Sequence, residues 1–219
     1  MTNQKKSILI IYIIIFYSIW TIFELYGKTY IDNVIEIKYI SQLIKSGIIK
    51  NLVWTLPAIL LIYHFKSDVY ITLKEMISSK VNWLKYLPIF MIFTAWILGG
   101  SILQNGKLEI TSNFGINEVI IVIFVGITEE IVFRGWLLNA TIREDKKWIF
   151  ILVNAMMFLI IHFPKYIYTG SFTSIFTSFD FLCIIALSII FSQTFLKSKN
   201  ILIPIFLHTY WDLLAFMFL

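Results

Sequence analysis

Residues 117–140 read NEVIIVIFVGITEEIVFRGWLLNA, and this stretch decides what kind of fold the chain can adopt. It is long enough to cross the hydrocarbon core of a bilayer as a helix, which takes about 20 residues. Three charged residues, Glu129, Glu130 and Arg134, interrupt its second half. Charged side chains are costly in lipid and almost always face the interior of a helix bundle. We therefore predict a membrane helix whose charged side faces other helices.

Six further apolar segments surround this one, at residues 7–26, 49–65, 86–103, 148–163, 175–196 and 201–219. Only helices and closed barrels satisfy their backbone hydrogen bonds in lipid. The segments are too long and too continuous for the alternating strands of a barrel. We expect an all-α polytopic membrane helix bundle with about seven transmembrane helices. No repeat or linker divides the chain, so residues 1–219 are predicted to form a single integral-membrane domain.

Composition excludes several other classes of protein. Hydrophobic residues make up 59% of the chain and charged residues 14%, whereas soluble domains carry about 25% charged residues. The single Cys183 excludes a disulfide scaffold. The net charge of +5 comes from Lys and Arg placed between apolar runs, so we expect the lipid bilayer and no nucleic acid as a partner.

Two stretches, residues 31–50 and 67–85, are amphipathic rather than continuously apolar. In both, apolar residues recur near helical spacing among Lys and Gln. We expect one or two helices that lie in the membrane interface.

The positive residues predict a multi-pass protein of the cell membrane with a cytoplasmic N-terminus. With that orientation, the later cytoplasmic loops clearly carry more Lys and Arg than the later outer loops. The difference is smaller for the first outer segment, which contains Lys28, Lys38, Lys45 and Lys50.

The two carboxylates of the fourth segment are expected to differ in role. Glu130 and Arg134 are four residues apart on one helix face and can form an ion pair. Glu129 is offset by about 100° around the helix and lacks that partner. Glu129 is therefore the candidate general base.

Other polar groups interrupt the later segments. His162 ends the fifth, and His208 and Asp212 share a face of the last, so three helices could bring a base and several donors together. Such a set suits activation of water for attack on a carbonyl. Taken singly, each has an ordinary explanation, such as a hydrogen bond between helices. Glu24, His64 and Asp180 are expected near span ends, at the interface.

In order along the chain, these residues form three motifs: EEIVFR at 129–134, FLIIH at 158–162 and HTYWD at 208–212. Together they resemble the CPBP family, the CAAX prenyl endopeptidases and bacteriocin-processing proteins also called Abi proteins. The resemblance covers the C-terminal half and implies a protease core at about 117–219. The N-terminal half shows no motif.

The resemblance implies an intramembrane endopeptidase that hydrolyses a peptide bond in a peptide or protein tail. Glu129 would activate the water and His162 would help to hold it. Glu130 and Arg134 would support the geometry. His208 and the residue four positions later would stabilise the oxyanion.

That later residue is Asp212, where the prenyl endopeptidases carry Asn. An ionised Asp cannot donate a hydrogen bond. Asp212 must therefore be protonated, orient His208, or bind a metal. Zinc is possible, with Glu129, His162, His208 and Asp212 as its ligands. No His-Glu-x-x-His motif is present, and we favour a glutamate-activated water without metal.

Two other functions compete with the protease. A non-catalytic membrane immunity or regulatory protein would use the same fold without the base. A transporter with a proton relay would require inverted repeats, which the sequence does not contain. For a protease, the expected substrates are leader peptides, peptide pheromones, bacteriocin precursors or membrane-protein tails.

Overall fold

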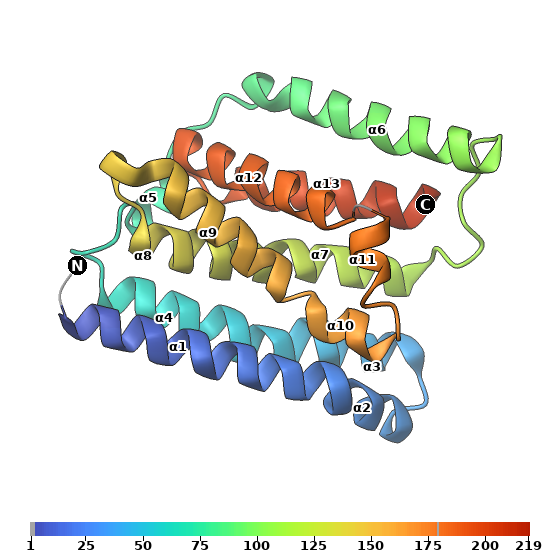
Figure 1. Ribbon diagram of the computed structural model, residues 1–219, viewed down its shortest axis with the longest axis horizontal. Coiled ribbons are helices and arrows are strands. Elements are labelled where there is room, and N and C mark those ends of the chain that lie inside the picture. The colour runs from blue at the N-terminus through green and yellow to red at the C-terminus, as the bar shows by residue number, and fades with distance from the viewer. Residues whose placement is uncertain (1–2, 179) are drawn as a thin grey trace.

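The computed structural model describes residues 3–178 and 180–219, and every regular element within these ranges is a helix. The long helices run roughly along one axis. The N-terminus lies at one end of the resulting bundle and the C-terminus lies toward the other (Figure 1). The prediction of an all-α helix bundle is confirmed.

Five helical stretches in the described residues are long and apolar enough to cross a membrane, and a sixth apolar helix is shorter. They are Asn3–Val34, Lys38–His64, Trp83–Asn105, Glu144–Tyr168 and Asp180–Ser198, with Leu202–Phe218 as the shorter one. Large apolar side chains such as Ile14, Met91 and Trp96 cover the outside of the bundle. Such a surface is suited to lipid rather than water.

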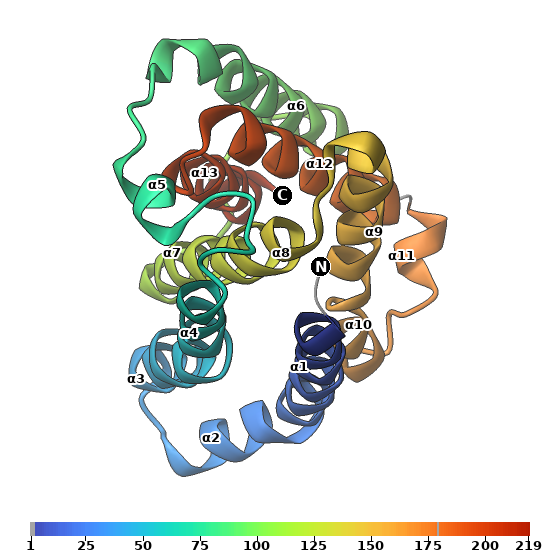
Figure 2. The same cartoon turned by 90° about the vertical axis from the view of Figure 1, so that its left-hand side faces the viewer.

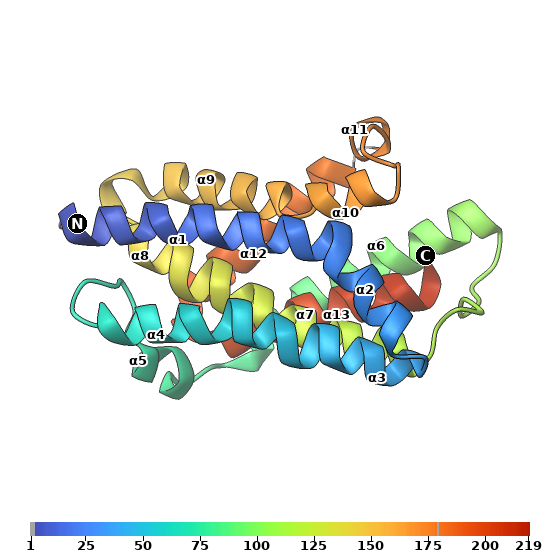
Figure 3. The same cartoon turned by 90° about the horizontal axis from the view of Figure 1, so that it is seen from below.

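The first two spans form a helical hairpin, seen side by side in Figure 3. The first contains α1 (Asn3–Ile22), the π-helical η1 (Phe23–Gly27) and α2 (Lys28–Val34). The second contains α3 (Lys38–Gln42), the π-helical η2 (Leu43–Ile49) and η3 (Asn51–Thr55), and α4 (Leu56–His64).

The expectation of a separate interfacial helix at residues 31–50 is wrong, because these residues extend both spans of the hairpin. Only residues 35–37 turn between them. The carboxylate of Asp32 accepts hydrogen bonds from Ser41 Oγ at 2.5 Å and Lys45 Nζ at 2.6 Å. Asp32, Ser41 and Lys45 therefore bind each other across the hairpin.

Residues 67–85 hold two short helices, α5 (Leu73–Ser78) and the 3₁₀ helix η4 (Trp83–Tyr86). Thr72 begins α5 with a capping box that it forms with Glu75. The next long helix, α6 (Leu87–Asn105), ends at Gly106, whose positive φ of 71° is readily adopted only by glycine. Figure 1 shows α6 along the edge of the bundle, next to α13.

The centre of the bundle is the segment predicted as the fourth membrane helix, here the central span, which is not among the five stretches named above. It consists of α7 (Ile116–Glu130), the π-helical η5 (Ile131–Leu138) and α8 (Asn139–Thr141). Viewed from the N-terminal end, it lies between α4, α9 and α13 (Figure 2). Gly126 permits the close crossing of α7 and α13, because a Cβ there would collide with the side chain of Thr209. The charged helix is thus surrounded by protein, as predicted.

The C-terminal part wraps around this central span. Its elements are η6 (Glu144–Lys146), α9 (Lys147–Ile160), α10 (Phe163–Tyr168), α11 (Ser174–Thr177), α12 (Asp180–Ser198) and α13 (Leu202–Phe218). The break between α9 and α10 falls at residues 161–162, and Pro164 lies in the first turn of α10. Proline fits the first turn of a helix because the backbone N–H there has no helical partner.

An aromatic cluster packs the N-terminal hairpin against the central span. The ring of Trp54 contacts those of Phe16, Trp20 and Phe133, with centroids 4.5–6.3 Å apart. Trp54 is fully buried, whereas Trp96 is 66% exposed on the outer surface.

We expect Trp54→Ala to destabilise the protein by about 3–5 kcal/mol, because it removes a buried aromatic side chain and leaves a cavity. Thermal unfolding in detergent, followed by helical circular dichroism, measures the loss. Trp96→Ala is the matched control and should unfold near the wild-type temperature. Equal losses in the two variants would contradict the assigned packing.

Candidate active site

Glu130 is the centre of a buried polar network. Arg134 Nη1 donates to Glu130 Oε1 at 2.9 Å, so the pair predicted from the spacing is present. Arg134 Nη2 also donates to Ser188 in α12, at 2.8 Å to Oγ and 3.1 Å to the backbone oxygen. Glu130 and Arg134 are both fully buried. The network therefore joins the central span to α12 and holds Glu130 in place.

His208 of α13 joins the same network. Its Nδ1 lies 2.8 Å from Glu130 Oε1, and its Nε2 lies 3.4 Å from Asp212 Oδ2. Its ring stacks on Phe191 at 4.9 Å. Each ring nitrogen faces a carboxylate oxygen; a neutral ring can donate to one of them, whereas an imidazolium can donate to both. The position of Asp212 fits the orienting role among the three considered above.

Glu129 is not the unpaired carboxylate expected from the sequence. Lys50 Nζ donates to Glu129 Oε1 at 2.7 Å, and both side chains are buried. The ammonium group of Lys50 also lies over the rings of Trp54 and Trp20, at 4.4 and 5.2 Å from their centroids. The second carboxylate oxygen, Glu129 Oε2, is buried and has no hydrogen-bond partner among the described residues.

His162 lies at the break between α9 and α10. Its Nδ1 donates to the backbone oxygen of Phe158 at 2.7 Å. In a neutral ring, that bond places the proton on Nδ1 and leaves Nε2 as a hydrogen-bond acceptor. His162 lines the same cavity as Glu129 and His208.

The cavity has a volume of about 370 Å³ and is bounded by both helices of the hairpin, α7, α9–α10 and α13. It contains Glu129, His162, His208 and Asp212, so the four predicted catalytic residues line one space. The hairpin adds charged groups that sequence reasoning missed as site residues: Glu24, Lys28, Lys45 and Lys50.

Glu24 does not lie at the interface near a span end, where the sequence predicts it; it is buried beside the cavity and pairs with Lys28 at 2.5 Å. In the sequence, Lys50 lies between the apolar residues 48–49 and 52–53 of a helical run. This position indicates a charged residue on a membrane helix, but it does not indicate that Glu129 is the partner of Lys50.

π-helical turns occur on three sides of the site, in η1, η2–η3 and η5. Such turns are rare and often occur at functional sites, because they widen the helix and change the direction of the side chains that follow. Here Glu24 lies within η1, Lys50 lies between η2 and η3, and Glu130 directly precedes η5.

The donor set does not fit the zinc site considered above. No group of three or more His, Cys, Asp or Glu side chains in residues 3–178 and 180–219 has the arrangement needed to hold a metal ion. Both nitrogens of His208 face carboxylates, and Glu129 already contacts the ammonium group of Lys50.

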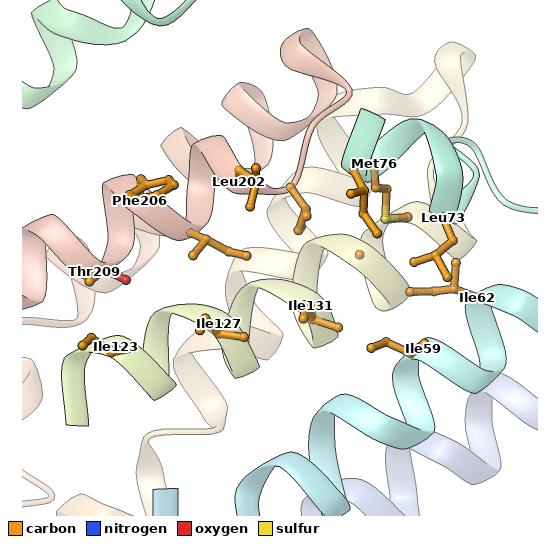
Figure 4. Close-up of a pocket in the computed structure, with 14 residues that line it drawn as sticks. Ile59, Ile62, Leu73, Met76, Ile123, Ile127, Ile131, Leu202, Phe206 and Thr209 are labelled. Atoms are coloured by element: carbon orange, nitrogen blue, oxygen red, sulfur yellow. The ribbon is translucent and has the colours of Figure 1, made fainter. Parts of the chain in front are cut away.

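A second hollow of about 580 Å³ contains almost only apolar side chains (Figure 4). Ile123, Ile127 and Ile131 line it from the central span, two residues away in the sequence from cavity residues Val125 and Glu129. Two residues correspond to about 200° around a helix. The central span therefore separates this apolar groove from the polar cavity, and only the cavity holds groups able to act as acids or bases.

Comparison with known proteins gives one family match. The family described as type II CAAX prenyl endopeptidase Rce1-like matches residues 111–214, which include all three motifs. No curated protein and no solved structure matches the chain significantly. The family match confirms, for residues 111–214, the resemblance to the CAAX endopeptidases that the three motifs indicate.

Proposed function

We propose that the protein is an intramembrane endopeptidase with Glu129 as its general base. The observation that carries the proposal is the polar cavity, in which Glu129, His162 and His208 meet from three spans. Within residues 3–178 and 180–219, Glu129 Oε2 has no hydrogen-bond partner. The family match over residues 111–214 supports the reaction class.

The first step is attack of water on the peptide carbonyl. Glu129 Oε2 accepts one proton of the water, and His162 Nε2 accepts a hydrogen bond from the other. The water oxygen bonds to the carbonyl carbon to form the tetrahedral intermediate. Glu129 then gives its proton to the leaving nitrogen, the C–N bond breaks, and an acid and an amine are released. A positioned acid or base typically contributes about 10²–10⁴-fold to the rate.

The oxyanion of the intermediate requires a donor. In this proposal His208 is protonated on both ring nitrogens: Nδ1–H donates to Glu130, and Nε2–H turns from Asp212, which orients the ring before substrate binds, to the oxyanion. Loss of one such donor typically lowers kcat by about 10²–10³-fold. Glu130 and Arg134 hold His208 in place through the Glu130 carboxylate.

Lys50 is the positioning residue for Glu129. Lys50→Met leaves Glu129 buried without its ion pair, which favours protonation of the base. We expect cleavage to fall by roughly 10–100-fold, less than the about 10²–10⁴-fold that a general base contributes, because the base itself is still present. Lys50→Arg should restore part of the activity, because it keeps the charge. Cleavage rates of a substrate in purified membranes measure the effect.

Lys38→Met is the matched control, since Lys38 is exposed on the same span. Wild-type cleavage by Lys50→Met, with the variant folded, would remove Lys50 from the mechanism.

The proposed mechanism uses no metal. Metal analysis of the purified protein tests this. Stoichiometric zinc that is lost in both His162→Ala and His208→Ala would overturn it.

The proposed substrates are leader peptides, peptide pheromones, bacteriocin precursors or membrane-protein tails. The test compares the new protein termini in cells that express the wild type with those in cells that express Glu129→Gln. New termini present only with the wild type support a protease. Identical termini, together with an intact cellular phenotype in Glu129→Gln, would favour a non-catalytic immunity or regulatory role.

A further inference from the structure

The cavity opens at the end of the bundle that lies opposite the N-terminus. Its deep residues Trp54, Glu129 and His208 are buried, whereas Lys165 and Phe216, which also line it, are exposed. Lys165 lies in α10 and Phe216 near the end of α13. Figure 1 places both helix ends away from the N-terminus. A substrate therefore enters from that end.

The two ends of the bundle differ strongly in positive charge. Of the 18 Lys and Arg residues, 11 lie at the N-terminal end and 6 at the cavity end, with Arg134 inside. The first group contains Lys5, Lys6, Lys66, Lys74, Lys80, Lys85, Arg143, Lys146, Lys147, Lys197 and Lys199. The second contains Lys28, Lys38, Lys45, Lys50, Lys107 and Lys165.

The structure also explains why the first outer segment contains several lysines although outer loops are usually poor in Lys and Arg. Four of the six at the cavity end form ion pairs: Lys28 with Glu24, Lys45 with Asp32, Lys50 with Glu129, and Lys107 with Glu109. Three of these lysines line the cavity. They belong to the site, so the loops at this end carry few positive charges of their own.

Loops rich in Lys and Arg remain in the cytoplasm. We infer that the cavity opens on the extracytoplasmic face of the membrane, and that the substrate is a polypeptide segment presented from that side. A translocated peptide precursor or the outer segment of a membrane protein meets this condition. A lipid-modified tail displayed only in the cytoplasm does not. The substrate class rests on the proposed function, whereas the position of the opening does not.

Single cysteines test the position of the opening. Cys183 is the only cysteine, so Cys183→Ala gives a background without thiols. Lys165→Cys marks the cavity mouth and Lys146→Cys marks the opposite end, and both positions are exposed. Lys107→Cys provides a second marker at the cavity end. Intact cells are treated with a membrane-impermeant maleimide, before and after permeabilisation.

We expect Lys165→Cys and Lys107→Cys to be labelled in intact cells, and Lys146→Cys only after permeabilisation. Labelling of Lys146→Cys in intact cells, or of the other two only after permeabilisation, overturns the inference. The same cysteines in the Glu129→Gln background should give the same pattern. Because labelling needs no catalysis, its outcome is independent of whether the protein proves to be a protease.

Discussion

Glu129→Gln should abolish proteolysis while the protein still folds, because the glutamine oxygen can still accept the hydrogen bond from Lys50. Glutamine keeps the size of the side chain and its hydrogen-bonding oxygen, but it cannot accept the proton of the attacking water. We expect the cleavage rate to fall by about 10²–10⁴-fold, the contribution typical of a general base. The rate is measured with a substrate identified from the comparison of new termini.

Glu109→Gln is the matched control. Glu109 is an exposed carboxylate in the loop after α6, paired with Lys107. This variant should cleave at the wild-type rate. Thermal unfolding of Glu129→Gln, followed by circular dichroism, separates a chemical loss from a structural one. Rapid cleavage by a folded Glu129→Gln variant would remove Glu129 as the base.

Arg134→Met should produce a large loss of stability. Arg134 is fully buried, and its guanidinium group binds Glu130 and Ser188. Removing one partner of a buried ion pair leaves the other charge uncompensated and costs about 3–5 kcal/mol. For a chain of this length, that corresponds to a fall in Tm of roughly 6–20 °C.

The chain offers a close control for this prediction. Arg143 is the only other arginine, and it forms an exposed pair with Asp145 at 3.2 Å. Exposed pairs contribute little to stability, so Arg143→Met should unfold near the wild-type temperature. If Arg134→Met were as stable as Arg143→Met, the network around Glu130 would not be what holds α12 and α13 against the central span.

Features that depend on local sequence could be predicted. The apolar runs give the helices, because lipid leaves the backbone no other way to satisfy its hydrogen bonds. The four-residue spacing of Glu130 and Arg134 predicts their ion pair. The order of the three motifs predicts that Glu129, His162 and His208 line one cavity.

The partner of Glu129 could not be predicted in this way. Lys50 is 79 positions away from Glu129 and lies outside the matched segment. Residues 31–50 combine apolar residues at helical spacing with charged ones. The same pattern is typical of a helix lying on a membrane surface and of a membrane helix whose polar side lines a cavity. Only the packing of the hairpin against the central span distinguishes the two.

The central claim is that water activated at Glu129 cleaves a peptide bond. Membranes that contain the wild-type protein or Glu129→Gln are incubated with a substrate in H₂¹⁸O, and the products are identified by mass spectrometry. We expect the wild type to release two fragments, with one ¹⁸O atom in the new C-terminal carboxylate, and Glu129→Gln to release neither. Equal release of the labelled fragments by both proteins would contradict the claim.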